Sequence, residues 1–383
     1  MAHPPADQTR PDGTRGIVLR SVQFDTGSTF ATGQGETSRN VWDTDLMNAE
    51  LDLVVELNAN SVNLYGSDLG RLSAAAESAV ERGLHVRLDP RLPDRSQEQV
   101  VDFVAELAGL AESLRKQGAP IDFTVGATHT IFTPGIFPGE PYLERLANIY
   151  FDGDQRFGVR EPKTADQWLT ENVTGMLTES APKLNAYLDR LVRVTRGIYH
   201  GRLSYTAAPW EQVDWTPFDA VSVVHYLFPA HMTVEQHLSE LGRYTRHGKP
   251  VFVSGFGTAS YQGAEEKGFF NWDIVDRSTP NLTILDGHER DEGAQAEYYG
   301  KMLEIFDRAG VYGVAPADLV HPTHPHHEAD VRHDLDMASM CIVRSVRTDF
   351  ADPNSQYKRT PKKSFHAVAA YYARVRDRAA VPA

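Results

Sequence analysis

Eight short runs rich in β-branched and aromatic residues recur along the 383-residue chain, and longer amphipathic stretches separate most of them. This alternation is typical of stacked βα units, in which helices join parallel strands. The predicted strands are 17–24, 61–65, 85–88, 121–125, 203–206, 220–224, 251–254 and 311–315, and the predicted helices are 45–57, 69–82, 97–116, 168–197, 234–247, 294–309 and 362–376. Eight units predict an α/β fold, the (β/α)₈ TIM barrel, although the connection 209–218 is too short for a full helix. A doubly wound sheet is the alternative.

One barrel accounts for nearly the whole chain. Residues 1–15 are polar and contain several prolines, without the apolar core of a signal peptide, and they predict a disordered arm in a cytoplasmic protein. The barrel domain is expected over residues 16–378, with a tail at 379–383. The connections 127–166, 255–290 and 316–340 are unusually long, and connections beyond about 12–15 residues are usually functional or disordered. Because all three follow strands, we expect them to surround one end of the barrel.

The charge balance argues against two classes of partner. The chain has 38 Lys and Arg against 52 Asp and Glu, a net charge of −14, and no block of basic residues offsets it. Nucleic-acid affinity depends on clustered cations, so nucleic acid is not an expected partner. The apolar runs are far shorter than the roughly 20 residues that cross a bilayer, so no membrane segment is expected. A small-molecule substrate is the expected partner.

The sequence indicates no cofactor. No Gly-rich phosphate-binding motif follows a predicted strand, and the single cysteine, Cys341, excludes an internal disulfide framework and any multi-cysteine metal site. Five of the 15 histidines lie within residues 321–333, a density that raises divalent-metal binding as an alternative. Their spacing lacks a helical His-x-x-x-His pair, and an exposed loop without a metal is the expectation.

Several motifs occur in a recognisable order. They include RSVQFDTG at 20–27, NANSVNLYGSD at 58–68, VGATHTIFTPGIFPG at 125–139, KPVFVSGFGTASYQGA at 249–264 and DVRHDLDMASMCIVRSV at 330–346. The chain resembles, over roughly residues 16 to 375, a bacterial family of TIM-barrel proteins related to clan A glycoside hydrolases, whose members often carry the label "abortive infection protein". The resemblance implies the barrel fold. In clan A, one glutamate after strand four is the acid/base, and another at the end of strand seven is the nucleophile, as retaining hydrolysis requires.

Both glutamate positions hold other residues here. Thr128 stands where the resemblance places the acid/base, and Gly255 stands where it places the nucleophile. The arginine that commonly follows strand two in this clan is matched by Asn63. The resemblance therefore implies that this chain does not perform ordinary retaining hydrolysis.

The candidate catalytic residues are His129, His225, Asp25 and Glu211, all of which follow or end predicted strands. Imidazole exchanges protons near neutral pH, so His129 and His225 are predicted to form an acid/base pair. The alternative is that each ring binds a backbone carbonyl. Asp25 is expected to hold substrate hydroxyls or to orient a histidine, although its Asp-Thr-Gly sequence is also typical of a turn.

The candidate substrate-binding residues lie at the same strand ends. Tyr65 and Tyr226 are predicted donors to a developing oxyanion. Trp210, next to Glu211, is predicted to form an aromatic platform with Trp215, and the alternative is that both tryptophans only pack. The remaining candidates are Asn63, Asp89, Thr128, Asp318 and His321.

Three functions remain open from the sequence. The first is a glycosidase-like barrel enzyme repurposed for non-hydrolytic acid/base chemistry, such as isomerisation, elimination, cyclisation or condensation, on a small polar or natural-product metabolite. The second is a catalytically dead barrel that binds a sugar-like ligand or a partner. The third is a glycoside hydrolase with substitute carboxylates, for which Asp25, Asp89, Glu211 and Asp318 are available.

Overall fold

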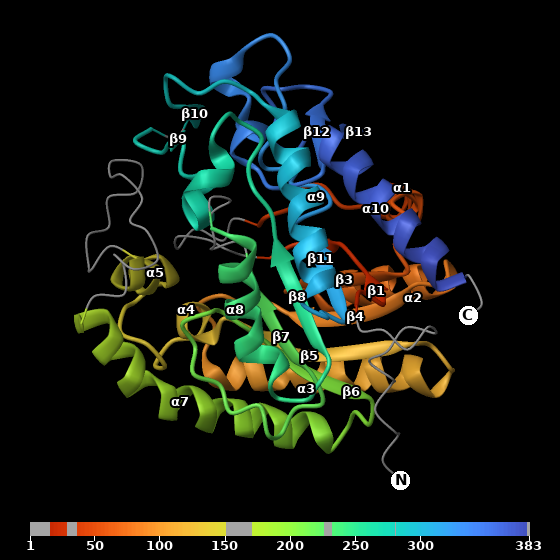
Figure 1. Ribbon diagram of the computed structural model, residues 1–383, viewed down its shortest axis with the longest axis vertical. Helices are drawn as coiled ribbons and strands as arrows, with labels where there is room; N and C mark the ends of the chain where they lie inside the picture. The colour runs from red at the N-terminus through yellow and green to blue at the C-terminus, as the bar shows by residue number, and fades with distance from the viewer. Residues whose placement is uncertain (1–15, 29–36, 151–170, 226–231, 280, 381–383) are drawn as a thin grey trace.

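A curved sheet of parallel strands forms the centre of the computed structural model, which describes residues 16–28, 37–150, 171–225, 232–279 and 281–380 (Figure 1). Nine strands belong to this sheet, in the order β1-β11-β8-β7-β6-β5-β4-β3-β2. Their bounds are β1 Leu19–Arg20, β2 Gln23–Asp25, β3 Ser61–Gly66, β4 His85–Pro90, β5 Ile121–Ala127, β6 Arg202–Ala207, β7 Val221–Val224, β8 Val251–Phe256 and β11 Gly313–Pro316.

The two end strands of this order close the sheet into a barrel. β1 pairs with β11 and β2 pairs with β3, and only two residues, Ser21 and Val22, separate β1 from β2 along the chain. Counted as one strand, β1 and β2 complete an eight-stranded parallel barrel, so the predicted (β/α)₈ fold is confirmed.

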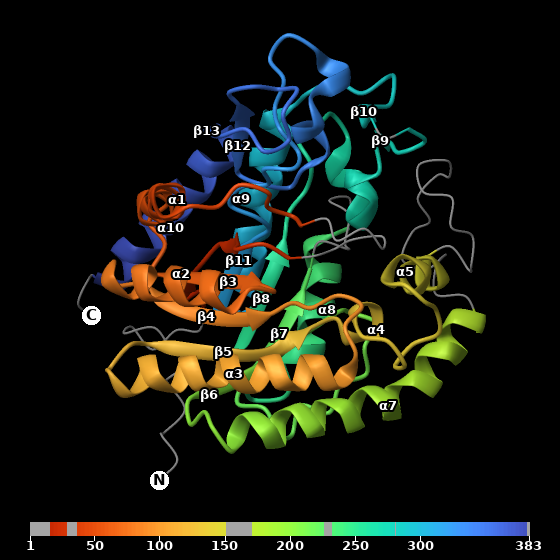
Figure 2. The ribbon, with the colours of Figure 1, turned by 180° about the vertical axis from the view of Figure 1, so that it is seen from behind.

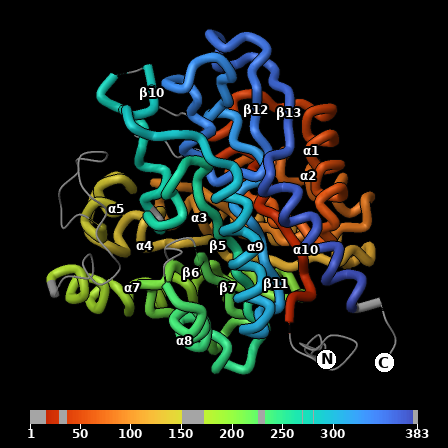
Figure 3. Tube along the Cα trace, turned by 45° about the horizontal axis from the view of Figure 1, so that its top comes forward, coloured from red at the N-terminus to blue at the C-terminus, as the bar shows by residue number. Residues whose placement is uncertain are grey.

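Helices surround the barrel, as Figure 3 shows, and most begin at a side chain that caps the first turn. The helices are α1 Thr44–Glu56, α2 Leu69–Glu81, α3 Gln97–Lys116, α4 His129–Phe132, α5 Tyr142–Tyr150, α7 Glu171–Arg196, α8 Val234–Thr245, α9 Glu292–Arg308 and α10 Lys363–Ala380. Asp43, Asp68 and Asp291 cap α1, α2 and α9, and α3 and α8 each begin with a full capping box. The main core of buried Leu, Val, Ile and aromatic residues lies between these helices and the strands.

Small additional elements gather at the end toward which the barrel strands point (Figures 1 and 2). The segment after β8 contains the 3₁₀ helix η1 (Ala264–Trp272) and the strand pair β9 (Val275–Asp276) and β10 (Thr283–Ile284). The segment after β11 contains η2 (Val331–His333), η3 (Leu335–Ala338) and the hairpin β12 (Val343–Arg347) and β13 (Tyr357–Pro361). The long connections after β8 and β11 therefore extend from one end of the barrel, as predicted.

Every predicted strand and helix has a counterpart, and the connection 209–218 holds no helix. Residues 168–170 of the predicted helix 168–197 and the proposed arm at 1–15 lie outside the described residues, and α10 continues to Ala380, into the expected tail. The β12–β13 hairpin is absent from the prediction because β13, with the sequence YKRTP, has no alternation of apolar residues. In the described part of the chain, no helix has the length and apolarity that a membrane span requires.

Candidate active site

The barrel interior contains two rows of polar side chains on neighbouring strands. Gln23, Asn63 and Arg87 are aligned across β2, β3 and β4, and Asp25, Tyr65 and Asp89 are aligned two residues further along the same strands. Side chains two residues apart on a strand face the same side of the sheet. The first row faces inward, since Arg87 Nη1 donates to Ser254 Oγ of β8 at 2.8 Å across the barrel. The second row therefore faces the mouth at the C-terminal end of the barrel, where this fold carries its active sites.

Asp318 joins this row from the segment after β11, where it follows a cis peptide bond with Ala317. The Tyr65 hydroxyl donates to Asp318 Oδ1 at 3.0 Å. Burial, and next the negative charge of Asp25, raise the pKa of Asp318 to about 7, while the Arg91 guanidinium and the hydrogen bond from Tyr65 act in the opposite direction. Burial, followed by the charges of Asp25 and Asp318, raises the pKa of Tyr65 well above its ordinary value. Tyr65 is therefore a neutral donor at physiological pH.

Asp89 is held by an arginine that the sequence analysis did not select. Arg91 Nη2 donates to Asp89 Oδ2 at 3.2 Å, and the Arg91 guanidinium lies over the Tyr65 ring, 4.0 Å from its centroid. The other oxygen, Asp89 Oδ1, is buried and has no hydrogen-bond donor among the described residues. The chain of contacts Asp89–Arg91–Tyr65–Asp318 thus connects the ends of β4 and β3 to the segment after β11.

Two more predicted residues lie near this group. Asp25, which is buried, accepts a hydrogen bond at Oδ1 from the Gly27 backbone N–H at 2.8 Å, as in an Asx turn. His321 is partly exposed, and its ring stacks on that of His324 with centroids 4.3 Å apart. Burial lowers the pKa of His321, while the charge of Asp25 opposes this shift, so the neutral imidazole is favoured.

The structure does not bring His129 and His225 together as an acid/base pair. His129 Nε2 lies 3.2 Å from the Val125 carbonyl, which can only accept, and Nδ1 lies 2.8 Å from Thr133 Oγ1. The ring stacks on Tyr205 and contacts Tyr187 of α7, and burial lowers its pKa to about 4. His129 therefore ties β5 to α4, as in the alternative considered from the sequence.

His225 faces a different pair of helices. Its Nε2 lies 3.1 Å from Nδ1 of His237 on α8, and its ring packs against Phe306 of α9. Burial, and then the charge of His237, lower its pKa well below the ordinary value. The ring thus lies between the barrel wall and the helices. Tyr226 lies outside the described residues.

Glu211 and Trp210 form hydrogen bonds between the segment after β6 and Thr130 of α4. The Glu211 carboxylate accepts hydrogen bonds at 2.8–3.0 Å from the Thr130 backbone and hydroxyl, the Tyr205 hydroxyl and the Ala208 N–H. Burial nevertheless raises its pKa, against the effect of those bonds. Trp210 donates from Nε1 to Thr130 Oγ1 at 3.1 Å and is only 8% exposed. Trp215 belongs to a different buried cluster, so the two tryptophans do not form the expected platform.

The two positions that the resemblance assigns to glutamates hold no carboxyl group in the structure. Thr128 adopts the left-handed conformation at the start of α4, with φ 46°, and its N–H donates to the Thr206 carbonyl at 2.9 Å. Gly255 lies within β8, and its carbonyl accepts from the His225 N–H at 2.7 Å. Neither position can supply the acid or the nucleophile of retaining hydrolysis.

A buried cation lies inside the barrel beside Asn63. Asn63 Oδ1 lies 3.3 Å from Ser21 Oγ and 3.5 Å from Arg87 Nη1, so it belongs to the barrel floor rather than to the rim. Arg87 also donates to Ser204 and Ser222, and its guanidinium lies over the Phe252 ring. Burial lowers the pKa of Arg87 to about 10, which leaves it charged at neutral pH. The sequence analysis did not select Arg87, although polar residues at inward-facing positions of neighbouring strands could have indicated it.

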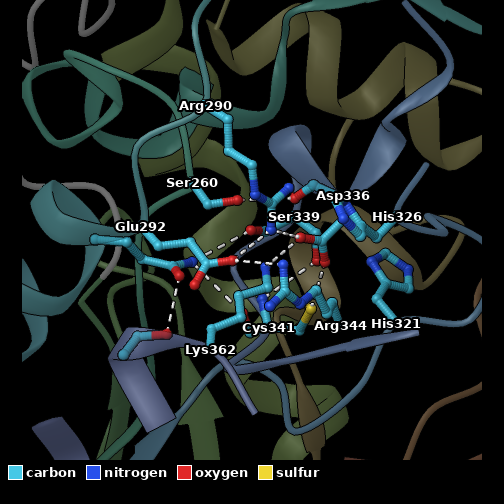
Figure 4. Close-up of polar contacts among 12 residues, drawn as sticks. Ser260, Arg290, Glu292, His321, His326, Asp336, Ser339, Cys341, Arg344 and Lys362 are labelled. Carbon is cyan, nitrogen blue, oxygen red and sulfur yellow. Dashed lines mark hydrogen bonds and ion pairs between the residues drawn. The ribbon is translucent and has the colours of Figure 1, made fainter. Parts of the chain in front are cut away.

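The histidine-rich segment contains one group with metal-ligand geometry. His326, Asp334 and Asp336 offer ligand atoms within 4.8 Å of one another. Cations of the protein already bind these carboxylates. Arg290 binds Asp334 at 2.8 Å. Arg290 and Lys362 bind Asp336 at 2.7 Å and 2.8 Å (Figure 4). His326 Nδ1 lies 2.9 Å from Asp334 Oδ1. This arrangement is an ion-pair network that connects the segment after β11 to α9 and α10.

Comparisons with known proteins agree with the architecture. No protein-family profile and no curated protein matches the sequence. Among solved structures, a GH113 β-1,4-mannanase is 14% identical with a TM-score of 0.54, over 94% of this chain and 99% of the mannanase. The GH113 β-mannanase AaManA from Alicyclobacillus acidocaldarius, in complex with ManMIm, is 16% identical with a TM-score of 0.54, over 94% and 98%. The β-glycosidase BGL167 is 12% identical with a TM-score of 0.50, over 93% and 96%. The chain therefore has a TIM-barrel fold similar to that of these mannanases and of this β-glycosidase.

Proposed function

We propose that this protein is an enzyme that binds a small polar metabolite in the barrel mouth and moves a proton on it through Asp318, assisted by Tyr65 and Asp25. The observation that carries the proposal is the Tyr65–Asp318 hydrogen bond at the C-terminal end of the barrel, next to the aligned Asp25 and Asp89. A carboxyl group whose pKa is about 7 can both accept and donate a proton near neutral pH.

The simplest reaction for this group is an isomerisation. The Asp318 carboxylate removes a proton from one substrate atom, and the resulting carboxylic acid returns a proton to another atom. Atoms and charges balance without a co-reactant. In this proposal the substrate displaces the hydrogen bond between Tyr65 and Asp318, and the Tyr65 hydroxyl then donates to the oxygen on which negative charge develops.

The residues at the two glutamate positions support a non-hydrolytic reaction, since Thr128 and Gly255 carry no carboxyl group. Glycoside hydrolysis by substitute carboxyl groups is the second candidate function. It is favoured because, in addition to burial, the negative charge of Asp25 raises the pKa of Asp318. That influence indicates that two carboxyl groups face the same mouth, and hydrolysis needs an acid and a second carboxylate.

Solvent deuterium exchange tests the proposal. The wild-type protein is incubated with a panel of aldoses and ketoses in deuterium oxide, and proton NMR follows incorporation at carbon and conversion to isomers. Asp318→Asn should lower exchange by at least about 100-fold. The matched control is Asp102→Asn, which changes an exposed carboxylate on α3 and should retain the wild-type rate.

Three results would decide against the proposal. Exchange that survives Asp318→Asn removes the assigned role. Release of a chromophore from nitrophenyl glycosides that is abolished by Asp25→Asn supports the hydrolase instead. Saturable binding of sugars with neither exchange nor release supports a barrel that only binds.

A further inference from the structure

Arg91 is the first residue after β4, and both its backbone and its side chain contact the residues of the mouth. Its N–H donates to the carbonyl of Gly66, the last residue of β3, at 2.9 Å. The side chain is 13% exposed and covers the Tyr65 ring, with the guanidinium 4.0 Å from the ring centroid. One terminal nitrogen donates to Asp89 at 3.2 Å. The guanidinium is therefore held between the end of β4 and the aromatic ring on β3.

This arrangement links the orientation of Tyr65 to Arg91. A planar guanidinium over the face of an aromatic ring, and bound by a carboxylate as well, restricts how that ring can tilt. The Tyr65 hydroxyl donates to Asp318 Oδ1 at 3.0 Å, so the tilt of the ring decides where this donor lies. A lysine ammonium is a compact charge without a planar surface, and it could not hold the ring in the same way.

The Arg91 cation also acts on the Asp318 carboxyl group. Burial and then the Asp25 charge raise the pKa of Asp318, and the Arg91 charge is the largest influence that lowers it. Arg39 acts in the same direction to a smaller extent and is bound to Glu50 at 2.8 Å. Among the described residues, the charged and titratable groups around Asp318 are Tyr65, Asp25, Arg91 and Arg39 and, from α9, Tyr299.

We propose that Arg91 is a positioning residue for the reaction of Asp318: its guanidinium orients the Tyr65 hydroxyl, and its positive charge keeps Asp318 able to accept a proton near neutral pH. The inference rests on the proposed function, which assigns the proton transfer to Asp318. It gives Arg91 two separable effects, one that needs the shape of the guanidinium and one that needs only a cation.

Two substitutions separate these effects in the deuterium-exchange assay, run from pH 5 to pH 9 with the aldoses and ketoses of the panel. Arg91→Met removes the cation, so the rise of the exchange rate with pH should move upward by at least about half a pH unit. Arg91→Lys keeps the cation, so its midpoint should match that of the wild type, while its maximal rate should fall at least about fivefold because Tyr65 is no longer held. The matched control is Arg95→Met, which changes an exposed arginine of the same connection and should keep both the midpoint and the rate.

Urea unfolding tests the effect of the charge without a substrate. Asp318→Asn is compared in the wild-type and in the Arg91→Met protein. Without the Arg91 cation, Asp318 keeps its proton to higher pH in the folded state. The stability that Asp318→Asn adds at pH 8 should therefore be larger in the Arg91→Met protein, and it should level off at higher pH. Circular dichroism melting verifies that each variant is folded.

Two results would overturn the inference. One is a folded Arg91→Met protein whose exchange midpoint and stability gain equal those of the wild type, because Arg91 would then only pack. The other is Arg91→Lys with the wild-type rate, because the guanidinium would then not be needed to orient Tyr65. Wild-type protein that exchanges no deuterium would overturn the proposed function and with it the role of Arg91 in a reaction, whereas the stability comparison alone decides whether Arg91 acts on Asp318.

Discussion

The raised pKa of Asp318 predicts a pH-dependent cost to stability that asparagine should remove. The pKa of this carboxyl is about 7 in the folded protein, against an ordinary value of 3.8. Between these values the folded protein keeps a proton that the unfolded chain releases. The stabilisation from this proton is complete below about pH 4, falls as the pH rises, and is lost above about pH 7.

The magnitude follows from the difference between the two pKa values. One pKa unit corresponds to about 1.4 kcal/mol, so a shift of roughly three units gives about 4 kcal/mol. This figure is an upper limit because Asp318 is partly exposed and solvent screens its charge. The asparagine side chain of the variant is neutral in both states, and its oxygen can still accept the bond from Tyr65. The Asp318→Asn protein should therefore equal wild type in stability near pH 4 and exceed it by about 2–4 kcal/mol at pH 8.

Urea unfolding followed by far-UV circular dichroism, from pH 4 to pH 8, measures this difference. Asp102→Asn should follow the wild-type stability at every pH. The reasoning is refuted if the stability gain of Asp318→Asn is independent of pH or is largest near pH 4. A change in the urea m value would show that the variant alters the folded or unfolded state in another way.

Asp25→Asn separates the two causes of the shift. Burial is the larger cause and is unchanged in this variant, whereas the negative charge of Asp25 is lost. The asparagine oxygen can still accept the Gly27 N–H. When Asp318→Asn is added to the Asp25→Asn protein, it should raise the free energy of unfolding by less than it does in the wild type. The increase should also be complete at lower pH, because the pKa of Asp318 is raised less without the Asp25 charge. An unchanged gain would assign the whole shift to burial.

Three further predictions concern the rest of the fold. Lys362→Met removes one of the two cations that bind the buried Asp336 carboxylate among the described residues and should lower the free energy of unfolding by about 3–5 kcal/mol in urea titrations, whereas Met at the neighbouring exposed Lys363 should have little effect. Gly126→Ala should be destabilising by thermal melting, because an added Cβ would lie 2.6 Å from the His129 ring and φ is +125°. Cys341 is buried and its thiol pKa is raised to about 12, so its reaction with Ellman's reagent should follow the fraction unfolded, and rapid labelling of the native protein would contradict the structure.

The sequence predicts the barrel well because its evidence is local and repeated. Each strand is a short β-branched run buried on both faces, which is the pattern of a parallel sheet covered by helices. The sequence also predicts that Asp25, Tyr65, Asp89 and Asp318 lie near one another, since parallel strands bring residues at their carboxyl ends to one rim. The hydrogen bond from Tyr65 to Asp318 and the ion pair of Arg91 with Asp89 depend on side-chain positions that no spacing determines.

Local irregularities of the barrel explain why the two histidines are misplaced by sequence reasoning. Inward and outward positions alternate along a regular strand, but the pairing register shifts between Thr124 and Ala127 of β5 and between Val223 and Val224 of β7. His129 and His225 follow these shifts directly, so counting residues does not determine the face on which their rings lie. No such shift is recorded between β2, β3 and β4, where the predicted mouth residues do lie on one face.

The place of the acidic group on the rim can be compared with the two positions at which the resemblance expects glutamates. Asp318, Asp25, Tyr65 and Asp89 belong to four adjacent places on the barrel, after β11 and on β2, β3 and β4. The strands next to this arc are β8 and β5, and these carry the two positions without carboxylates, Gly255 and Thr128. A ligand bound in this mouth would therefore lie close both to the acidic group and to the strands that lead to Gly255 and Thr128. Under the proposed function, the substrate binds at the C-terminal end of the barrel, as in other enzymes of this fold. The residues that transfer the proton lie between β8 and β5, on the side of the rim formed by β11, β2, β3 and β4.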